Sequence, residues 1–301
     1  MLKSPPVIPQ HLINMMRELG PKWGSNIREY TKLQSEAFSE ILIHAPKEGI
    51  ETREIPYGVH SRQVLDVFSP RSALNAPVII FAHGGAFIEG NKDRTAEIYS
   101  NVGWYFARKG VVTINMEYRL APEFKYPTGV QDVAATVCWT RDNISRFGGN
   151  PERIFLFGHS AGAAHVGCYA YDQRFHTKGV SGISGLIVVS GRVRIDNLPM
   201  NPNAKNVEAY FGTNSDLMAQ GSVVNHVNEN SVPTMISIAE YENPLIDVYC
   251  LELAYKLSLV KSLAPRTVWL GGHNHNSSIA HLNTADERLG NEILDFIRLG
   301  R

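Results

Sequence analysis

The stretch that decides the fold is residues 157–162, which read Phe-Gly-His-Ser-Ala-Gly. It follows an apolar run at residues 154–157 that predicts a buried strand, and it precedes small residues that predict a tightly packed helix. The pattern is therefore Gly-x-Ser-x-Gly at a strand-to-helix turn, a context that indicates a nucleophile elbow. The flanking glycines let neighbouring backbone approach closely, which leaves the Ser160 hydroxyl exposed at the tip of the sheet. Ser160 is the predicted nucleophile, although an ordinary serine in a glycine-flanked turn would carry the same local pattern.

The whole chain has the size and balance of one large globular α/β domain. It has 301 residues, 44% of them hydrophobic, with 29 basic and 29 acidic side chains. No basic stripe points to nucleic acid, and no cationic amphipathic or long apolar segment points to a membrane. The cysteines Cys138, Cys168 and Cys250 stand singly in apolar or helical segments, as buried thiols in a reducing compartment do. Because the N-terminus lacks the apolar run of a signal peptide, a cytoplasmic protein is expected.

The chain divides into a helical start and a larger strand-rich part. Residues 1–48 carry apolar side chains at helical spacing and are expected to form a cap or lid, or to pack on the flank of the sheet. Residues 49–301 are expected to form the catalytic domain, which begins with an antiparallel hairpin at 51–57 and 63–68.

From residue 77 onward, apolar runs alternate with helical patterns. The predicted strands are 78–82, 111–116, 154–157, 185–190, 234–239 and 267–270, and the predicted helices are 95–109, 129–147, 245–263 and 285–299. This alternation predicts a mostly parallel, doubly wound α/β sheet with helices on both faces. Residues 192–232, rich in Asn, Gly and Pro, interrupt it and are expected to form a second cap segment over the carboxyl ends of the strands.

A second motif, His-Gly-Gly-Ala-Phe at residues 83–87, directly follows the predicted strand 78–82. Acyl transfer needs backbone N–H groups aimed at the developing oxyanion, and glycines let the backbone come close to the substrate. The predicted oxyanion-hole residues are Gly84, Gly85, Ala86 and Ala161. His83 is expected to stabilise the loop by hydrogen bonds and not to act as a base.

Between these two motifs, residues 117–123 read Glu-Tyr-Arg-Leu-Ala-Pro-Glu. This segment resembles the Tyr-Arg-Leu-Ala-Pro-Glu segment of the hormone-sensitive-lipase-like esterases, which have the α/β-hydrolase fold. The resemblance extends over roughly residues 50–300, and it implies that fold with a Ser–acid–His triad in this chain order. One position departs from the pattern: His159 stands where most of that family has Asp. The same variant recurs in related branches, including arylformamidase-like hydrolases.

The resemblance also directs the search for the acid and the histidine. The family's Ala-Glu-x-Asp-Pro segment matches residues 239–244 and implies Glu242 as the triad acid, with Glu240 and Asp247 as weaker rivals. After the predicted strand 267–270, the loop offers His273 and His275, and the family pattern favours His275 as the general base.

Two further readings of this histidine-rich loop are weaker. His281 is expected on the following helix, where it is less well placed to act on Ser160. A His-x-His pair is also a possible metal ligand pair, but the sequence offers no third ligand at suitable spacing nearby, so no metal is predicted.

Residues near the motifs are candidates for substrate contacts. Phe87, Tyr118, His159 and Tyr241 are the predicted substrate-binding residues, and Tyr210 and Phe211 are further candidates for the wall of an acyl or aryl pocket. Arg192 and Arg194 follow the predicted strand 185–190, where they would either grip a substrate carboxylate or form structural ion pairs.

The expected activity is hydrolysis of short-chain or aromatic carboxylic esters through an acyl-enzyme on Ser160. An arylformamidase or other amide hydrolase with the same triad is the alternative, and a binding protein on this fold would require a broken triad. The partner is a small-molecule ester or amide, and the chemistry needs no cofactor. A homodimer through an edge strand or the last helix is an option that the sequence leaves open.

Overall fold

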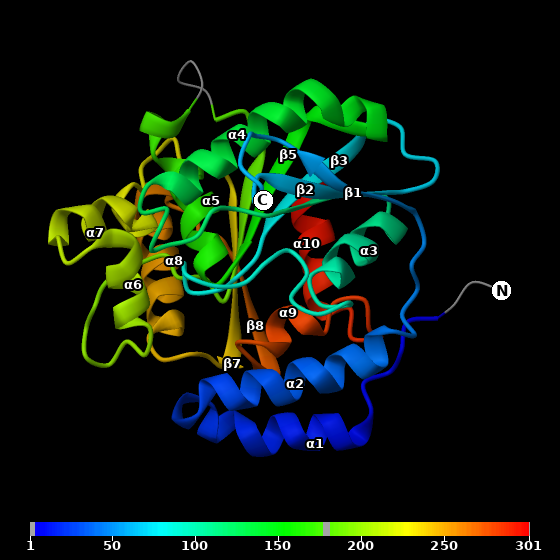
Figure 1. Ribbon diagram of the computed structural model, residues 1–301, viewed down its shortest axis with the longest axis horizontal. Coiled ribbons are helices and arrows are strands. Elements are labelled where there is room, and N and C mark those ends of the chain that lie inside the picture. Colours follow the sequence, from blue (N-terminus) through cyan, green and yellow to red (C-terminus); the bar gives the residue numbers. More distant parts are fainter. Residues whose placement is uncertain (1–3, 177–180, 301) are drawn as a thin grey trace.

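The computed structural model of the protein describes residues 4–176 and 181–300. Within these ranges, eight strands form one sheet in the order β1-β2-β4-β3-β5-β6-β7-β8 (Figure 1). β1 and β2 run antiparallel to their neighbours, and the pairs from β4 to β8 are parallel. The strands are Ile50–Pro56 (β1), Val64–Ser69 (β2), Ala76–Ala82 (β3), Val112–Met116 (β4), Gly149–His159 (β5), Gly185–Val189 (β6), Thr234–Tyr241 (β7) and Arg266–Asn274 (β8). The predicted mostly parallel sheet with a leading hairpin is confirmed.

Helices cover both faces of the sheet. They are Gln10–Leu19 (α1), Gly20–Ser25 (η1), Ile27–Leu42 (α2), Ser100–Arg108 (α3), Thr128–Asn143 (α4), Ile144–Phe147 (η2), Ala161–Tyr171 (α5), Gln173–Phe175 (η3), Ala204–Phe211 (α6), Ser215–Gly221 (α7), Val223–Asn225 (η4), Ile246–Lys261 (α8), Ser277–Ala280 (α9) and Arg288–Leu299 (α10). No helix in the described ranges is both long and apolar enough to cross a lipid bilayer.

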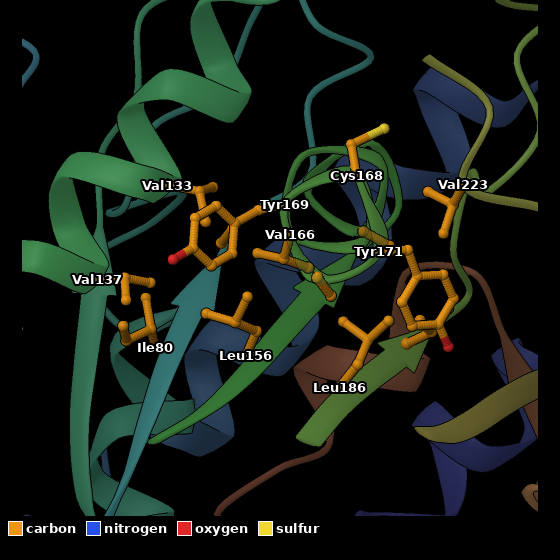
Figure 2. Close-up of a cluster of buried hydrophobic side chains, with 14 of the residues drawn as sticks. Ile80, Val133, Val137, Leu156, Val166, Cys168, Tyr169, Tyr171, Leu186 and Val223 are labelled. Atoms are coloured by element: carbon orange, nitrogen blue, oxygen red, sulfur yellow. The ribbon is translucent and has the colours of Figure 1, made fainter. Parts of the chain in front are cut away.

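Two apolar clusters hold these layers together, because successive side chains of a strand point to opposite faces. Ile80 and Leu156 lie on the face covered by α4, α5 and α8, where Figure 2 shows them against Val133, Val137 and Val166. The neighbouring strand residues, such as Phe81, belong to the opposite cluster with side chains of α1, α2, α3 and α10. The two clusters fix the sheet from which the loops at its carboxyl edge project.

The predicted helix at 95–109 begins only at Ser100. The Thr95 hydroxyl accepts hydrogen bonds from the backbone N–H groups of Glu97 and Ile98, at 3.2 and 3.0 Å. Tyr99 then adopts a φ of +83°, outside the helical region. A side-chain-capped turn therefore replaces the first turn of the predicted helix.

The predicted last helix at 285–299 likewise starts later, at Arg288. The backbone N–H of Ala285 donates to the carbonyl of Pro6 at 2.8 Å, and Asp286 bonds His273 through its side chain. These two tertiary contacts hold residues 285 and 286 outside the helix, and the sequence pattern carries no trace of them.

The two predicted cap segments lie at the carboxyl ends of the strands. Figure 1 shows α1 and α2 side by side at one end of the molecule, close to β7 and β8. Residues 192–232 contain the short helices α6 and α7, whose presence the sequence reading missed. Whether either segment moves as a lid stays a prediction.

Candidate active site

Ser160 sits at the sharp turn between β5 and α5, with φ 55° and ψ −122°. Its backbone N–H donates to the Val189 carbonyl at 3.2 Å, and the Ser160 carbonyl accepts from Ala163 N–H at 3.1 Å. A Cβ built on Gly162 would lie 2.2 Å from the carbonyl oxygen of Ala82, so only glycine fits this approach of α5 to β3. The turn has the geometry of a nucleophile elbow.

His275 lies beside the Ser160 hydroxyl. It follows the end of β8, and its Nε2 is 2.9 Å from Ser160 Oγ. Its backbone N–H donates to the carbonyl of Tyr241 at 3.0 Å, which ties the loop after β8 to the end of β7. The imidazole is therefore placed to exchange a proton with the serine.

Glu242 holds the other ring nitrogen of His275. Its Oε2 is 2.7 Å from His275 Nδ1, and its Oε1 accepts a hydrogen bond from Ala239 N–H at 2.9 Å. The side chain is 3% exposed, so water does not replace either contact. Of the two rivals, Glu240 turns away to accept from Gly272 N–H at 2.7 Å, and Asp247 is exposed in the first turn of α8.

The other two histidines of this region face away from Ser160. His273 contacts Ser277 Oγ through Nδ1 and Asp286 Oδ2 through Nε2, both at 3.1 Å. The His281 ring stacks at a tilt on the His273 ring, 4.4 Å between centroids, directly after α9 instead of within a helix. His275 alone of the three bonds Ser160.

The candidate metal-ligand group in this region does not contain the His-x-His pair, because His275 bonds Ser160 and Glu242 and only His273 belongs to the group. Ligand atoms of His273, His281 and Asp286 lie within 4.8 Å of one another, because the loop after α9 brings Asp286 back to β8. The Asp286 carboxylate is already bonded to Arg288, at 2.8 Å from its Nη2. The Arg288 guanidinium therefore already occupies the carboxylate that a metal ion at this site would need.

The loop after β3 supplies free backbone N–H groups in front of Ser160. Gly84, Gly85 and Ala86 all line the pocket, with φ of +148° at Gly85 and +47° at Ala86. Among the described residues, no acceptor takes a hydrogen bond from the N–H of these three or of Ala161, the first residue of α5. Three of the four predicted residues thus line the pocket beside Ser160, the fourth follows Ser160 directly, and their role as oxyanion donors stays a prediction.

His83 holds this loop in place through both of its ring nitrogens. Its Nδ1 is 2.7 Å from the Gly84 carbonyl and its Nε2 is 3.0 Å from Glu117 Oε1. Burial opposes ionisation of Glu117, but the hydrogen bond from His83 and the nearby charge of Arg62 outweigh it and lower the pKa of this carboxyl. Both ring nitrogens of His83 face acceptor oxygens, so neither is free to act on Ser160.

A pocket of about 690 Å³ lies in front of Ser160 and His275. Both predicted cap segments contribute to its wall. The α2 side chains there include Arg28, Thr31, Lys32 and Ser35, and the 192–232 segment contributes Pro202, Asn203 and Asn206. Most of the lining side chains carry amides, hydroxyls or charges, and Ile27, Ile88 and Pro202 add apolar surface to the wall.

Of the four predicted substrate contacts, only His159 lines the pocket. Its Nε2 lies 3.0 Å from the His275 carbonyl, and burial, followed by the nearby His275, holds the pKa of His159 well below its usual range. The imidazole is therefore neutral at pH 7, where an aspartate in this position would be charged.

The other three predicted substrate contacts are corrected by the structure. Phe87 is 1% exposed and stacks on Tyr210 at 5.0 Å, because its φ of +73° turns the side chain back toward α6. Tyr118 is fully buried and stacks on His83 at 4.3 Å. The Tyr241 ring packs against Gly20 of η1, outside the pocket.

The two arginines after β6 also stand away from the pocket wall. Arg192 is 2% exposed, with its guanidinium 5.7 Å from the Tyr249 ring centre, and burial lowers its pKa. Arg194 forms an ion pair with Glu252 of α8. The geometry therefore favours a structural role for both arginines over binding of a substrate carboxylate.

The sequence reading missed the polar residues that build the pocket wall. Arg94 lies in the turn before α3, with its Nη1 3.3 Å from the Tyr99 hydroxyl, and Asn276 follows His275 directly. Arg28 and Lys32 stand one turn apart on α2. Their spacing on one face of a predicted helix could have indicated a charged surface on α2, whereas no local sequence pattern identifies Arg94 as a pocket residue.

A family comparison matches residues 65–248, more than half of the chain, to BD-FAE. The chain belongs to the BD-FAE family. It is 33% identical over 148 residues to an arylesterase of Saccharolobus solfataricus, covering 46% of each chain. It is 34% identical over 118 residues to carboxylesterase NlhH of Mycobacterium tuberculosis, covering 39% of this chain and 36% of that protein. The chain thus matches less than half the length of these relatives.

Solved structures resemble the chain over nearly its whole length. An esterase of Pyrobaculum calidifontis superposes with a TM-score of 0.72 at 21% identity, covering 98% of this chain and 99% of that chain. A bacterial heroin esterase superposes with a TM-score of 0.70 at 20% identity, covering 92% of each. With the strand order above, these likenesses show that this member of the BD-FAE family has the α/β-hydrolase fold.

Proposed function

We propose that the protein is a serine hydrolase that cleaves carboxylic esters through an acyl-enzyme on Ser160. The observation that carries the proposal is the chain of contacts from Ser160 Oγ to His275 at 2.9 Å and from His275 to Glu242 at 2.7 Å. A serine hydroxyl becomes a useful nucleophile when a base takes its proton and a third group orients that base. The names of the relatives as arylesterase and carboxylesterase support the same chemistry.

In the first step, Ser160 Oγ attacks the ester carbonyl carbon while His275 Nε2 takes the hydroxyl proton. The carbonyl π electrons move to its oxygen, which accepts hydrogen bonds from the N–H groups of the 84–86 loop and Ala161. The tetrahedral intermediate then collapses, the C–O bond to the alcohol breaks, and His275 returns the proton to the leaving oxygen. The Glu242 carboxylate keeps Nδ1 protonated throughout and stabilises the transient imidazolium.

In the second step, water repeats the attack on the acyl-enzyme. His275 takes a proton from that water as its oxygen adds to the acyl carbon, and the same N–H groups hold the second oxyanion. Collapse breaks the bond to Ser160 Oγ, which regains the proton from His275, and the free acid leaves.

The pocket supports small or polar acyl groups over long aliphatic ones. Its wall carries Asn203, Asn206 and Thr31, and polar groups lose hydration when a long aliphatic chain covers them. We therefore propose short-chain or aromatic esters as substrates. Since amide cleavage would use the same triad, aryl formamides are the alternative substrate class.

Steady-state hydrolysis of a small panel tests this proposal. The panel holds p-nitrophenyl esters of increasing acyl length, an aryl formamide and an aryl amide, with Ser160→Ala as the control. We expect turnover that is highest for short acyl chains and that falls by roughly 10³-fold or more in Ser160→Ala. A preference for the formamide would move the protein to the amide hydrolases, and equal rates in the variant would overturn the role of Ser160.

We also propose that the protein works in a reducing compartment such as the cytoplasm. Cys168 and Cys250 are buried thiols whose pKa values are raised by burial, so they react slowly with oxidants.

A further inference from the structure

Tyr99 adopts a strained backbone conformation directly before α3. Its φ of +83° lies outside the regions that a bulky side chain ordinarily allows. The backbone N–H of Tyr99 donates to Asn101 Oδ1 at 2.8 Å, and the ring is 1% exposed and packs at a tilt on Phe81. Strain of this kind persists only where the surroundings enforce it, and it is concentrated at binding and catalytic sites. The position of this tyrosine therefore calls for a functional explanation.

The strained turn brings the Tyr99 hydroxyl close to the nucleophile. A Cβ built on Gly84 would lie 3.4 Å from the Tyr99 hydroxyl oxygen and 3.0 Å from Ser160 Cβ. Tyr99, Gly84 and Ser160 also line the same pocket. A buried ring thus delivers one polar atom to the part of the wall next to Ser160.

This hydroxyl holds the guanidinium of Arg94. Arg94 Nη1 lies 3.3 Å from the Tyr99 hydroxyl, and Arg94 Cζ lies 6.0 Å from the centre of the Tyr99 ring. In the part of the chain that the structure describes, no carboxylate forms an ion pair with Arg94 and no other group accepts its hydrogen bonds. Most of its five N–H donors are therefore free, and their planar arrangement matches the two oxygens of a carboxylate.

The guanidinium is accessible from the pocket, and its charge acts on the active site. Arg94 is exposed and belongs to the pocket wall. After burial and the nearby His275, the charge of Arg94 is a further cause that lowers the pKa of His159. His159 directly precedes the nucleophile, so the positive charge lies near the point where an ester would react.

The charges of the pocket wall favour an anionic ligand over a cationic one. Among the described residues, the charged side chains of the wall are Arg28, Lys32, Arg94, Glu36 and Glu89. Lys32 lies 3.9 Å from Glu36 on the exposed surface of α2, so these two charges offset each other. Two arginines then remain against the single carboxylate of Glu89. A negatively charged group that enters the pocket is therefore attracted to it.

We propose that Arg94, held in place by Tyr99, binds a carboxylate of the substrate, so that the substrates are esters that carry a carboxylate away from the scissile bond. This inference names the substrate class of the proposed hydrolase and rests on that function. The distances that join Ser160 to Arg94, by way of Gly84 and Tyr99, are 3.0, 3.4 and 3.3 Å. An ester of the size of acetylated 4-hydroxybenzoate is long enough to react at Ser160 and to reach Arg94.

Two esters that differ in one charge test the assignment. 4-Acetoxybenzoate and its methyl ester at the benzoate carboxyl share the acetyl group and the aromatic ring, and release of the phenol is followed by absorbance. We expect the kcat/KM of the wild type to be roughly tenfold or more higher for the carboxylate. Arg94→Gln should remove most of this preference through a higher KM for the carboxylate and leave the methyl ester within about twofold of the wild type. Arg94→Lys, which keeps the charge but loses the planar fork, should retain part of it.

Arg71→Gln is the matched control for net charge. Arg71 is exposed in the loop between β2 and β3 and lies outside the pocket wall, so its loss changes the charge of the protein without changing the wall. We expect this variant to keep the preference of the wild type. A wild type that hydrolyses the methyl ester faster, or an equal loss of preference in Arg71→Gln and Arg94→Gln, would overturn the proposal.

Calorimetry separates the carboxylate site from the proposed activity. Ser160→Ala cannot form the acyl-enzyme, and it should bind 4-acetoxybenzoate roughly tenfold more tightly than the methyl ester. Ser160→Ala/Arg94→Gln should bind the two compounds alike. If the binding difference is present but the wild type hydrolyses neither ester, the hydrolase proposal fails while the carboxylate site stands. If Ser160→Ala binds both compounds alike, the carboxylate site is overturned whatever the activity.

Discussion

Ser160 holds a backbone conformation that a non-glycine residue adopts only where its surroundings enforce it. Its φ of +55° costs on the order of 1–3 kcal/mol. Three backbone hydrogen bonds hold it: Ser160 N–H donates to Val189, and its carbonyl accepts from Ala163 and Arg192. The strain places the hydroxyl at the tip of the turn, within reach of His275 and of the free N–H groups. The conformation therefore lowers the stability of the fold but fixes the position of the nucleophile.

At the same scale, two neighbouring glutamates make a matched pair for testing the triad acid. Glu242→Gln keeps the size of the side chain and an acceptor for Ala239 N–H, but it removes the charge that balances the His275 imidazolium. We expect kcat to fall by roughly 10³- to 10⁴-fold with little change in KM. Glu240→Gln, which alters the contacts with Gly272 and Tyr241 but none with His275, should stay within about tenfold of the wild type. Equal losses in the two variants would contradict the assignment of Glu242.

The residues that form the chain of contacts could be read from the sequence, because the turn and the loops that carry them have local signatures. Ser160, Glu242 and His275 each stand within five residues of the end of an apolar run, the family resemblance selected the acid and the histidine, and the structure brings the three side chains together. The substrate contacts could not be read in this way. The direction of Phe87 depends on a positive φ, and that of Tyr118 on its stacking with His83.

At the scale of elements, all six strands after the hairpin were predicted, since buried parallel strands are continuous apolar runs. Four of them were predicted within two residues of their observed bounds, whereas β5 starts five residues earlier than predicted, at Gly149, and β8 ends four residues later, at Asn274. The starts of α3 and α10 were missed because a side-chain cap at Thr95 and a contact of Ala285 with Pro6 replaced helical turns. The sequence left open whether the helical segment 1–48 covers the pocket or packs on the flank of the sheet, and α2 lines the pocket. Helical periodicity shows that a helix has an apolar face but not which surface that face covers.

The N-terminal segment also reaches the loops that carry the acid and the base. The Trp23 indole of η1 donates to Asn243 Oδ1 at 2.8 Å, in a buried contact next to Glu242. On α2, the Ser35 hydroxyl lies 3.4 Å from the amide nitrogen of Asn276, next to His275. The segment that was predicted as a cap is therefore also a support for both loops.

Trp23→Phe tests that support. The change removes one N–H donor, leaves Asn243 Oδ1 without its partner, and should lower the free energy of unfolding by about 1–3 kcal/mol. Because the Glu242 loop loses a fixed contact, we expect kcat to fall by roughly tenfold while KM changes little. Steady-state kinetics and urea unfolding measure the two effects, with Lys22→Ala at the exposed neighbouring position as the control. A loss of stability with unchanged kcat would show that Trp23 stabilises the fold but does not support the loop that carries Glu242.

At the scale of the whole molecule, three histidines are buried in the core without charge. Burial is the main cause that lowers the pKa of His165 and of His281 to about 3, and the pKa of His159 also lies well below 6.5. The His165 ring contacts the rings of Phe87 and Tyr118, and among the described residues His165 Nε2 has no hydrogen-bond partner. Protonating such a ring would place an uncompensated charge in the core.

The sign of the resulting pH dependence follows from proton uptake. Below pH 6.5 the unfolded chain binds protons at these histidines, whereas the native protein does not until the pH approaches 3, so the free energy of unfolding falls as the pH falls. Each histidine should contribute roughly 2 kcal/mol between pH 7 and pH 5. Carboxyls with lowered pKa values, such as Glu117, act in the same direction but chiefly below their ordinary value of 4.5. The window from pH 6.5 to 5 therefore reports mainly on the histidines.

His165→Leu tests whether a neutral buried histidine causes the loss of unfolding free energy at low pH. The variant removes one titrating group from the core, so its loss of unfolding free energy between pH 7 and pH 5 should be smaller than that of the wild type by roughly 2 kcal/mol. Urea unfolding at the two pH values measures both losses. Val166→Ala, at the next position of α5, should lower stability by the same amount at both pH values and leave the difference unchanged. If His165→Leu lost as much stability on acidification as the wild type, the neutral core histidine would not be the source of the acid sensitivity.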